Sequence, residues 1–237
     1  MNFGKKLMQR SRIKINIFPD GAKLRPNSMR AFVGISLNNK TMASTELLGL
    51  IFNWTDRNVG KFDLLVGDYL NRYNYQAFDG ETEASAVARA KEAGAEAKRR
   101  LDPLISSPGP YGNAAIISTA TLCEHPTFSS RRAHFMRYYS DNSEFRSIVQ
   151  EGVDAFLARR HPQAVNDPAT RDYCVAYQLE ELVMFEQLAR DGYGVFVYPG
   201  AQLPIMKRLV SKFFIGASAE IEKLVLVELR VFEDNNR

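Results

Sequence analysis

The chain has 237 residues, of which 45% are hydrophobic and 24% charged, and this is an ordinary globular composition. Its net charge of +4 is mild and compatible with an acidic partner. No apolar run approaches the roughly 20 residues of a membrane-spanning helix, and the basic N-terminus lacks the apolar core of a signal peptide. We therefore expect one cytoplasmic domain over residues 1–237, with no membrane partner.

The first part of the chain predicts a strand–helix–strand unit. Residues 1–30 form a polar, basic lead-in, in which the alternating segment 13–17 is compatible with a short strand. Residues 30–35 and 62–66 are predicted core strands, and Ser44 or Thr45 caps a helix between them. Such a unit brings its two strands together in parallel.

Residues 81–100 are rich in alanine and charge and are predicted to be helical. Acidic residues begin the segment and basic residues end it, an order that complements the helix dipole. One interpretation is a solvated amphipathic helix; the other is a face that binds nucleic-acid phosphates. The cations of this segment are Arg89, Lys91, Lys98, Arg99 and Arg100.

The remaining elements continue the alternation of strands and helices. The predicted strands are residues 114–117, 194–198 and 224–232, and the predicted helices are 128–160, broken near 140–143, then 170–190 and 204–214. Residues 102–112, with three prolines and two glycines, are predicted to be a loop. The pattern favours an α/β fold, a Rossmann-like parallel sheet sandwiched by helices.

Several kinds of site are not expected, because the sequence lacks the motifs that they require. The turn after the first strand, residues 34–39, has one glycine, so a dinucleotide site is not expected. A phosphate-binding P-loop is absent, and Asn38 replaces the second glycine of a hydrolase nucleophile elbow. The two cysteines and three histidines have no metal-ligand spacing, so we expect neither a metal nor another cofactor.

A serine, two tyrosines and a glutamate form the candidate site. Ser36 follows the first core strand, where ligands of open α/β sheets bind, and Gly34 leaves room beside it. Tyr177 and Glu181 share one helix face, and Glu181 can hold an ammonium ion. Tyr198, at the end of a later strand, can pass a proton. Without a histidine in triad order, Ser36 suits an acyl donor that is already activated. A turn serine and an exposed helix pair remain the alternative interpretation.

Three motifs in order resemble the cyclodipeptide synthase family. They are Phe32-Val-Gly34-Ile-Ser36-x-x-Asn39, Tyr177-x-x-x-Glu181-Leu182 and Tyr198-Pro199. The resemblance implies the Rossmann-like core of class I aminoacyl-tRNA synthetases. Their ATP-handling signatures, His-Ile-Gly-His and Lys-Met-Ser-Lys-Ser, are missing here, so amino acids are expected to arrive on tRNA and not through ATP.

The resemblance also implies a ping-pong aminoacyltransferase reaction of secondary metabolism. Ser36 would carry an aminoacyl ester, a second aminoacyl-tRNA would give a dipeptidyl-enzyme, and cyclisation would release a 2,5-diketopiperazine. Tyr177 and Glu181 would hold the ammonium group, and Tyr198 would assist proton transfer. The basic helix would meet the tRNA backbone. The residues expected around the first, uncharged pocket are Gly34, Asn39, Leu64 and Leu65.

The chain departs from the family at two points. Val183 replaces the proline that usually follows the Tyr-x-x-x-Glu-Leu motif. The chain has both Asn39, typical of one branch, and Tyr198-Pro199, typical of the other, and we favour the Tyr-Pro branch. Two other functions remain open: a synthetase-like tRNA-binding protein without catalysis, and a serine acyltransferase independent of RNA.

Overall fold

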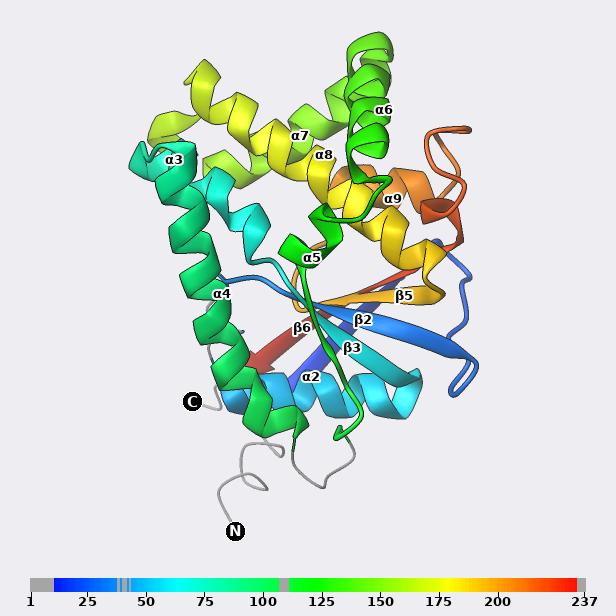
Figure 1. The fold of residues 1–237 in the computed structure, drawn as a ribbon. Helices are drawn as coiled ribbons and strands as arrows, with labels where there is room; N and C mark the ends of the chain where they lie inside the picture. Colours follow the sequence, from blue (N-terminus) through cyan, green and yellow to red (C-terminus); the bar gives the residue numbers. More distant parts are fainter. Residues whose placement is uncertain (1–10, 38, 40–41, 43, 107–110, 234–237) are drawn as a thin grey trace.

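The computed structural model describes residues 11–37, 39, 42, 44–106 and 111–233 (Figure 1). The strands are β1 (Ser11–Phe18), β2 (Met29–Ile35), β3 (Gly60–Val66), β4 (Ile116–Ser118), β5 (Tyr193–Tyr198) and β6 (Val225–Glu233). The helices are α2 (Thr45–Asn58), α3 (Arg72–Asp79), α4 (Glu83–Ile105), α5 (Thr119–Cys123), α6 (Phe128–Asp141), α7 (Ser143–Arg160), α8 (Pro168–Arg190) and α9 (Pro204–Val210). Short 3-10 helices are η2 (Tyr69–Asn71), η3 (Pro162–Ala164) and η4 (Ile221–Lys223).

In the described part of the chain the strands form one sheet in the order β1-β6-β5-β2-β3-β4. Each neighbouring pair from β6 to β4 is parallel. The edge strand β1 runs antiparallel to β6. The predicted α/β fold is therefore confirmed, and the sheet is mixed because part of the basic lead-in supplies its antiparallel edge.

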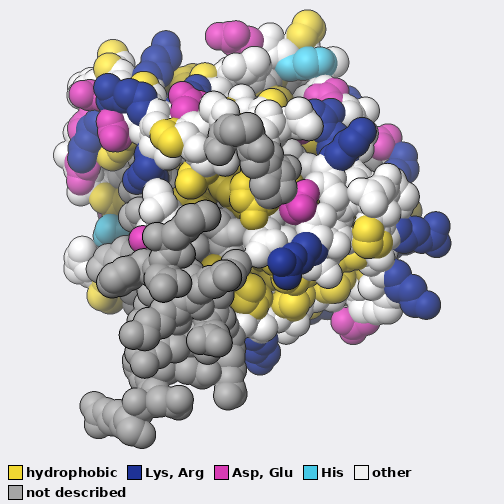
Figure 2. Space-filling model, turned by 90° about the horizontal axis from the view of Figure 1, so that it is seen from below, with side chains coloured by type: hydrophobic (Ala, Val, Ile, Leu, Met, Phe, Trp, Pro, Cys, Tyr) yellow, Lys and Arg dark blue, Asp and Glu magenta, His cyan; other side chains and the backbone are white. Residues whose placement is uncertain are grey.

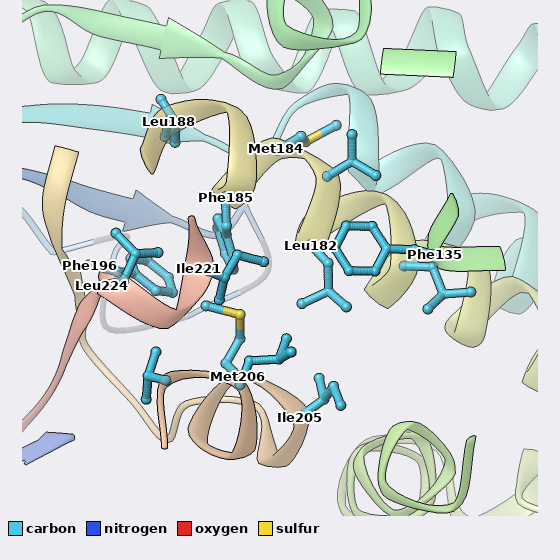
Figure 3. Packing of buried hydrophobic residues seen from close by; sticks show 14 of the residues in the cluster. Phe135, Leu182, Met184, Phe185, Leu188, Phe196, Ile205, Met206, Ile221 and Leu224 are labelled. Atoms are coloured by element: carbon cyan, nitrogen blue, oxygen red, sulfur yellow. The ribbon is translucent and has the colours of Figure 1, made fainter. Parts of the chain in front are cut away.

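Helices cover both faces of the sheet (Figure 1). On one face α2 and the C-terminal half of α4 pack on the sheet, and Leu48 and Leu101 are fully buried there. On the other face α8 lies across the sheet together with α6, α7 and α9. Figure 3 shows Leu182 and Phe185 of α8 pointing towards Met206 of α9. Burial on both sides explains why the parallel strands are almost continuously apolar.

Local signals place most helix boundaries. The Ser44 side chain accepts a hydrogen bond from the Leu47 N–H at 3.3 Å, which makes Ser44 the N-cap of α2. Asn142 ends α6 and caps α7, so the predicted break within 128–160 is confirmed. Asp167 caps α8, and Pro168 occupies its first turn.

Two predicted boundaries were wrong. The predicted loop 102–112 is helical at its start, because α4 continues to Ile105 with Pro103 inside its last turn. Proline removes one backbone donor, and the burial of Leu101 and Ile105 compensates for that loss. Residues 107–110 of that loop lie outside the described residues. The helix predicted over 204–214 ends at Val210.

Candidate active site

The site lies where β2, β3 and β5 end. Ile35 pairs with Val66, and Val33 pairs with Val197, so the carboxyl ends of the three strands meet at one edge of the sheet. The Gly67 N–H donates to the Ile35 carbonyl at 3.0 Å and closes β3 against β2. This edge is where parallel α/β sheets bind ligands.

Ser36 opens the turn after β2. Its backbone N–H lies 2.8 Å from the sulfur of Met42, which is fully buried. The Asn39 N–H donates to the Ser36 carbonyl at 3.3 Å, and the Met42 N–H donates to the Asn39 carbonyl at 2.9 Å. The buried methionine therefore anchors the turn, which presents Ser36 and Asn39 at the same edge. Asn38, which occupies the position of the second glycine in a nucleophile elbow, lies outside the described residues.

Tyr198 joins the two ends of this turn through its hydroxyl group. Burial raises the pKa of Tyr198 and the negative charge of Glu181 adds to the rise, while side-chain hydrogen bonds with Asn39 and Ser36 oppose it. The Asn39 amide also donates to the Pro199 carbonyl at 3.3 Å. The structure therefore brings Ser36, Asn39 and the Tyr198-Pro199 pair into one hydrogen-bonded network.

Tyr177 and Glu181 approach this network from α8. The Tyr177 hydroxyl lies 4.0 Å from the position that a Cβ on Gly67 would take, so the tyrosine reaches the end of β3. Burial raises the pKa of Glu181 to about 8. Burial also raises the pKa of Tyr177, and the nearby Glu181 adds to that rise. Among the described residues no cation or hydrogen-bond donor pairs with the Glu181 carboxylate, so burial alone accounts for the shift of its pKa.

The neighbouring glutamate of α8 is fully paired, and sequence reasoning missed it. Glu180 is 3% exposed, forms an ion pair with Arg72 at 2.7 Å and another with Arg132 at 2.8 Å, and accepts a hydrogen bond from Tyr73 at 2.7 Å. Burial and the Glu180 charge raise the pKa of Tyr73. Successive helix residues point about 100° apart, so Glu180 joins α8 to α3 and α6 while Glu181 faces the sheet edge. The signal that was available is the Arg72-Tyr73 pair just after a predicted strand.

The four residues expected around the first pocket, Gly34, Asn39, Leu64 and Leu65, do not all lie on the same side of the sheet. A Cβ on Gly34 would lie 2.9 Å from Phe196 Cε2 and 3.2 Å from Tyr198 Cδ2, so this glycine makes room for two aromatic rings. Leu65 packs in the cluster on the α8 face, against which Tyr177 also packs. Leu64 packs on the α2 face instead, so the two leucines lie on opposite sides of the sheet. Successive residues of a strand point to opposite faces, so both leucines cannot line one pocket.

The five cations of α4 do not form one face. Lys91 and Lys98, seven residues apart, share one side of the helix, whereas Arg89 lies on the opposite side. Arg89 pairs with Asp79 and Glu81, Arg99 pairs with Glu96, and Lys98 lies 3.3 Å from Asp68. Lys91 is exposed, and Arg100 is partly buried. In Figure 2 basic and acidic side chains are interleaved on the left, the side on which α4 lies in Figure 1.

Two further features limit the kinds of site on the described residues. No group of three or more histidine, cysteine, aspartate or glutamate side chains among them is arranged to hold a metal ion. Within the same residues, no helix combines the length and the apolar character that crossing a bilayer requires.

Comparison with known proteins identifies the family. The family model described as cyclodipeptide synthase matches residues 23–214. The solved cyclodipeptide synthase of Fluoribacter dumoffii is similar over 94% of this chain and 99% of its own, with a TM-score of 0.76 and 17% identity. A Mycobacterium tuberculosis protein, solved to show that cyclodipeptide synthetases are related to type I tRNA synthetases, has a TM-score of 0.71 and 16% identity over 95% of each chain.

A third structure shows a ligand. The cyclodipeptide synthase of Candidatus Glomeribacter gigasporarum, bound to Phe-tRNAPhe, has a TM-score of 0.59 and 19% identity, and covers 88% of this chain and 89% of its own. A search of curated proteins finds no match. At these identities the structural likeness shows the fold, and the family model carries the assignment. Because that model spans most of the sequence, the chain belongs to the cyclodipeptide synthase family and is an aminoacyl-tRNA-dependent transferase.

Proposed function

We propose that this enzyme makes a 2,5-diketopiperazine from two aminoacyl-tRNAs by a ping-pong reaction on Ser36. One observation carries the proposal. Burial raises the pKa of Tyr198, the Glu181 carboxylate, which has no partner among the described residues, lies near enough to add to that rise, and the side chains of Asn39 and Ser36 lie near enough to oppose it. A nucleophile, a proton carrier and an ammonium-binding group therefore lie together at the edge of the sheet.

The proposed reaction has three steps, and in each of them one bond to a carbonyl carbon forms as another breaks. The Ser36 hydroxyl attacks the ester carbonyl of the first aminoacyl-tRNA, and the tRNA leaves with the proton. The amine of the resulting aminoacyl-enzyme attacks the carbonyl of the second aminoacyl-tRNA, which leaves the dipeptide on Ser36 and releases the second tRNA. The free amine then attacks the Ser36 ester, closes the ring and regenerates the hydroxyl. Each step exchanges an already activated ester, so no other energy source is required.

Glu181 suits both holding the amine and releasing it. The pKa of Glu181, about 8, lies close to the 7.7–8.0 of an ordinary α-amino group. A carboxylate of this pKa holds the ammonium form by charge and can accept its proton with little free-energy change, which leaves the amine nucleophilic. We assign a hydrogen bond to the same amine to Tyr177, and proton transfer in ring closure to Tyr198.

The Ser36→Ala variant tests the covalent route. We expect no aminoacyl-enzyme by intact-protein mass spectrometry and no cyclic dipeptide after incubation with charged tRNAs. Ser44→Ala is the matched control, because Ser44 caps α2 outside the network and its loss should leave product formation intact. Cyclic dipeptide formed at the normal rate by Ser36→Ala would contradict the ester intermediate. Unchanged tRNA binding by Ser36→Ala, with no product even from the wild type, would indicate a binding protein without catalysis.

We further propose that Lys91 and Lys98 form the side of α4 that meets the tRNA backbone. Lys91→Glu should weaken tRNA binding and reduce its salt dependence by about one phosphate contact. Arg89→Glu is the control, because Asp79 and Glu81 already neutralise that arginine. Equal losses in the two variants would contradict this assignment. Turnover of a small ester without RNA, indifferent to both changes, would indicate an RNA-independent acyltransferase.

We also place the chain in the Tyr-Pro branch and its reaction in the cytoplasm, where aminoacyl-tRNAs are made. The hydrogen bond from Asn39 to the Pro199 carbonyl supports a structural part for Asn39 within that branch. The asparagine amide bridges the turn after β2 and the corner after β5, so its presence is compatible with Tyr198-Pro199.

A further inference from the structure

A buried carboxylate interrupts the apolar first half of β6. Glu228 lies in the middle of β6 and is 1% exposed. Its oxygens accept hydrogen bonds from the Gln202 backbone N–H at 2.9 Å and the Asn16 amide at 3.0 Å, and form an ion pair with Lys207. Burial opposes ionisation, but these partners hold the pKa of Glu228 below its ordinary value. A buried charge is tolerated only with such partners, so its place in the strand requires an explanation.

Glu228 lies beside Tyr198. The two residues are register partners in the parallel pairing of β5 with β6. Glu228 accepts the backbone N–H of Gln202, and the Gln202 side chain donates to the Val227 carbonyl at 3.3 Å. The segment that follows Tyr198 is therefore fastened to β6 at Gln202.

That segment folds against the ring of Tyr198. The Gly200 N–H donates to the Tyr198 carbonyl at 2.9 Å. A Cβ on Gly200 would lie 2.9 Å from Tyr198 Cε1, and a Cβ on Gly34 would lie 3.2 Å from Cδ2 of the same ring. The ring is therefore held between two glycine backbones, with its hydroxyl on Asn39 and Ser36. Gly200, on one side of the ring, lies two residues before Gln202, whose backbone N–H donates to Glu228.

We propose that Glu228 is a positioning residue for the reaction, which acts through Gln202 and Gly200 to hold the Tyr198 hydroxyl against Ser36. This inference rests on the function proposed for Ser36 and Tyr198. It explains a buried carboxylate at this point of β6, where an apolar residue would satisfy the core but would leave the Gln202 N–H without its acceptor.

A second buried acid of the same sheet provides the matched control. Asp63 on β3 is 3% exposed, accepts the Ala115 N–H at 2.7 Å and the Tyr193 hydroxyl at 2.6 Å, and pairs with Arg30 at 2.6 Å. Tyr193 begins β5 and Tyr198 ends it, so Asp63 holds the end of the sheet away from the site. Asp63→Asn should lower the stability of the fold, as Glu228→Gln does, but it should not change the position of Tyr198.

The test is a double-mutant cycle with Tyr198→Phe, measured on the full chain. Glu228→Gln removes the charge that pairs with Lys207 and replaces one of the two acceptor oxygens by an amide donor, which loosens the contact with Gln202. It should leave the Ser36 aminoacyl ester within about threefold of the wild type and lower cyclic dipeptide release by about tenfold or more, because a small misplacement of a reacting group costs such factors. In the Tyr198→Phe background Glu228→Gln should cost less than about threefold, because the two changes remove one interaction. Asp63→Asn should lower cyclic dipeptide release by the same factor in the wild-type and Tyr198→Phe backgrounds.

Two outcomes would overturn the inference: equal losses from Glu228→Gln in both backgrounds, or an equal fall in ester formation and in release. If Glu228→Gln does not fold, Gln202→Pro removes the donor at the same contact and enters the same cycle. A wild-type chain that forms neither the Ser36 ester nor a cyclic dipeptide would instead refute the proposed function. The two failures are therefore distinguishable.

Discussion

Glu181 makes the stability of this enzyme depend on pH in an unusual direction. Burial raises its pKa from 4.5 to about 8. Between these two values the folded state keeps a proton that the unfolded chain has lost. The contribution of Glu181 to stability is therefore fully present below about pH 4.5 and is lost as the pH rises towards 8. The loss amounts to about 1.4 kcal/mol per pH unit.

The Glu181→Gln variant isolates this contribution. Glutamine has nearly the shape of the protonated glutamate and does not ionise. The free energy of unfolding of the variant, minus that of the wild type, should therefore rise by roughly 2–3 kcal/mol between pH 5 and pH 7 and level off above pH 8. Urea unfolding followed by the fluorescence of Trp54, the single tryptophan, measures this difference. Contributions of other titrating groups cancel in the subtraction.

The matched control is Glu92→Gln, because Glu92 is exposed on α4. For this pair the difference in unfolding free energy should stay flat across the same pH range. A flat difference for Glu181→Gln as well would refute the reasoning, because it would mean that Glu181 ionises in the folded protein as it does in the unfolded chain. A variant less stable than the wild type at pH 8 would refute it more strongly.

Two glycines give predictions of steric origin. Gly200→Ala should lower cyclic dipeptide formation by about tenfold or more, because its Cβ would displace the ring of Tyr198, while the melting temperature changes by only a few degrees. Gly94→Ala should destabilise the fold by about 1–3 kcal/mol in urea unfolding, because its Cβ would lie 2.3 Å from Asp68 Cβ and push α4 away from the end of β3. Gly49→Ala, whose Cβ would meet open space in α2, is the control for both and should stabilise by about 1 kcal/mol. Wild-type activity in Gly200→Ala, or a neutral Gly94→Ala, would contradict the packing described.

Much of the fold could be predicted from the sequence, because most of its strands and helices are determined by residues close together in the chain. Apolar runs of strand length, a serine cap before α2 and a polar break near Asn142 each act within a few residues. The end of α4 could not be read in this way, because Pro103 is a local stop signal that the burial of Ile105 in the tertiary core overrides. The opposite facing of Leu64 and Leu65 could be read from the sequence, since alternation along a strand separates neighbouring residues.

The candidate site was harder to predict because its contacts join distant parts of the chain. Periodicity placed Tyr177 and Glu181 on one face, and strand ends placed Ser36 and Tyr198 at one edge. No local pattern reports that the Asn39 amide reaches the Pro199 carbonyl, 160 residues away. Likewise, the room beside Gly34 belongs to the rings of Phe196 and Tyr198, a fact that depends on the neighbouring strand.

The two adjacent glutamates of α8 show how the site relates to the stability of the fold. Glu180 is buried with two arginines and joins three helices, whereas Glu181 is left without a partner among the described residues. A buried carboxylate without a cation destabilises the folded state at neutral pH, and pairing it with a protein cation would remove that cost. Under the proposed function, a substrate ammonium group would supply the same charge only while it is bound. Ligand that binds the folded state alone raises its stability, so an aminoacyl ligand should protect the wild type more strongly than Glu181→Gln. Greater protection of the wild type would support the proposed role of Glu181 in ligand binding, and equal protection of the two proteins would contradict it.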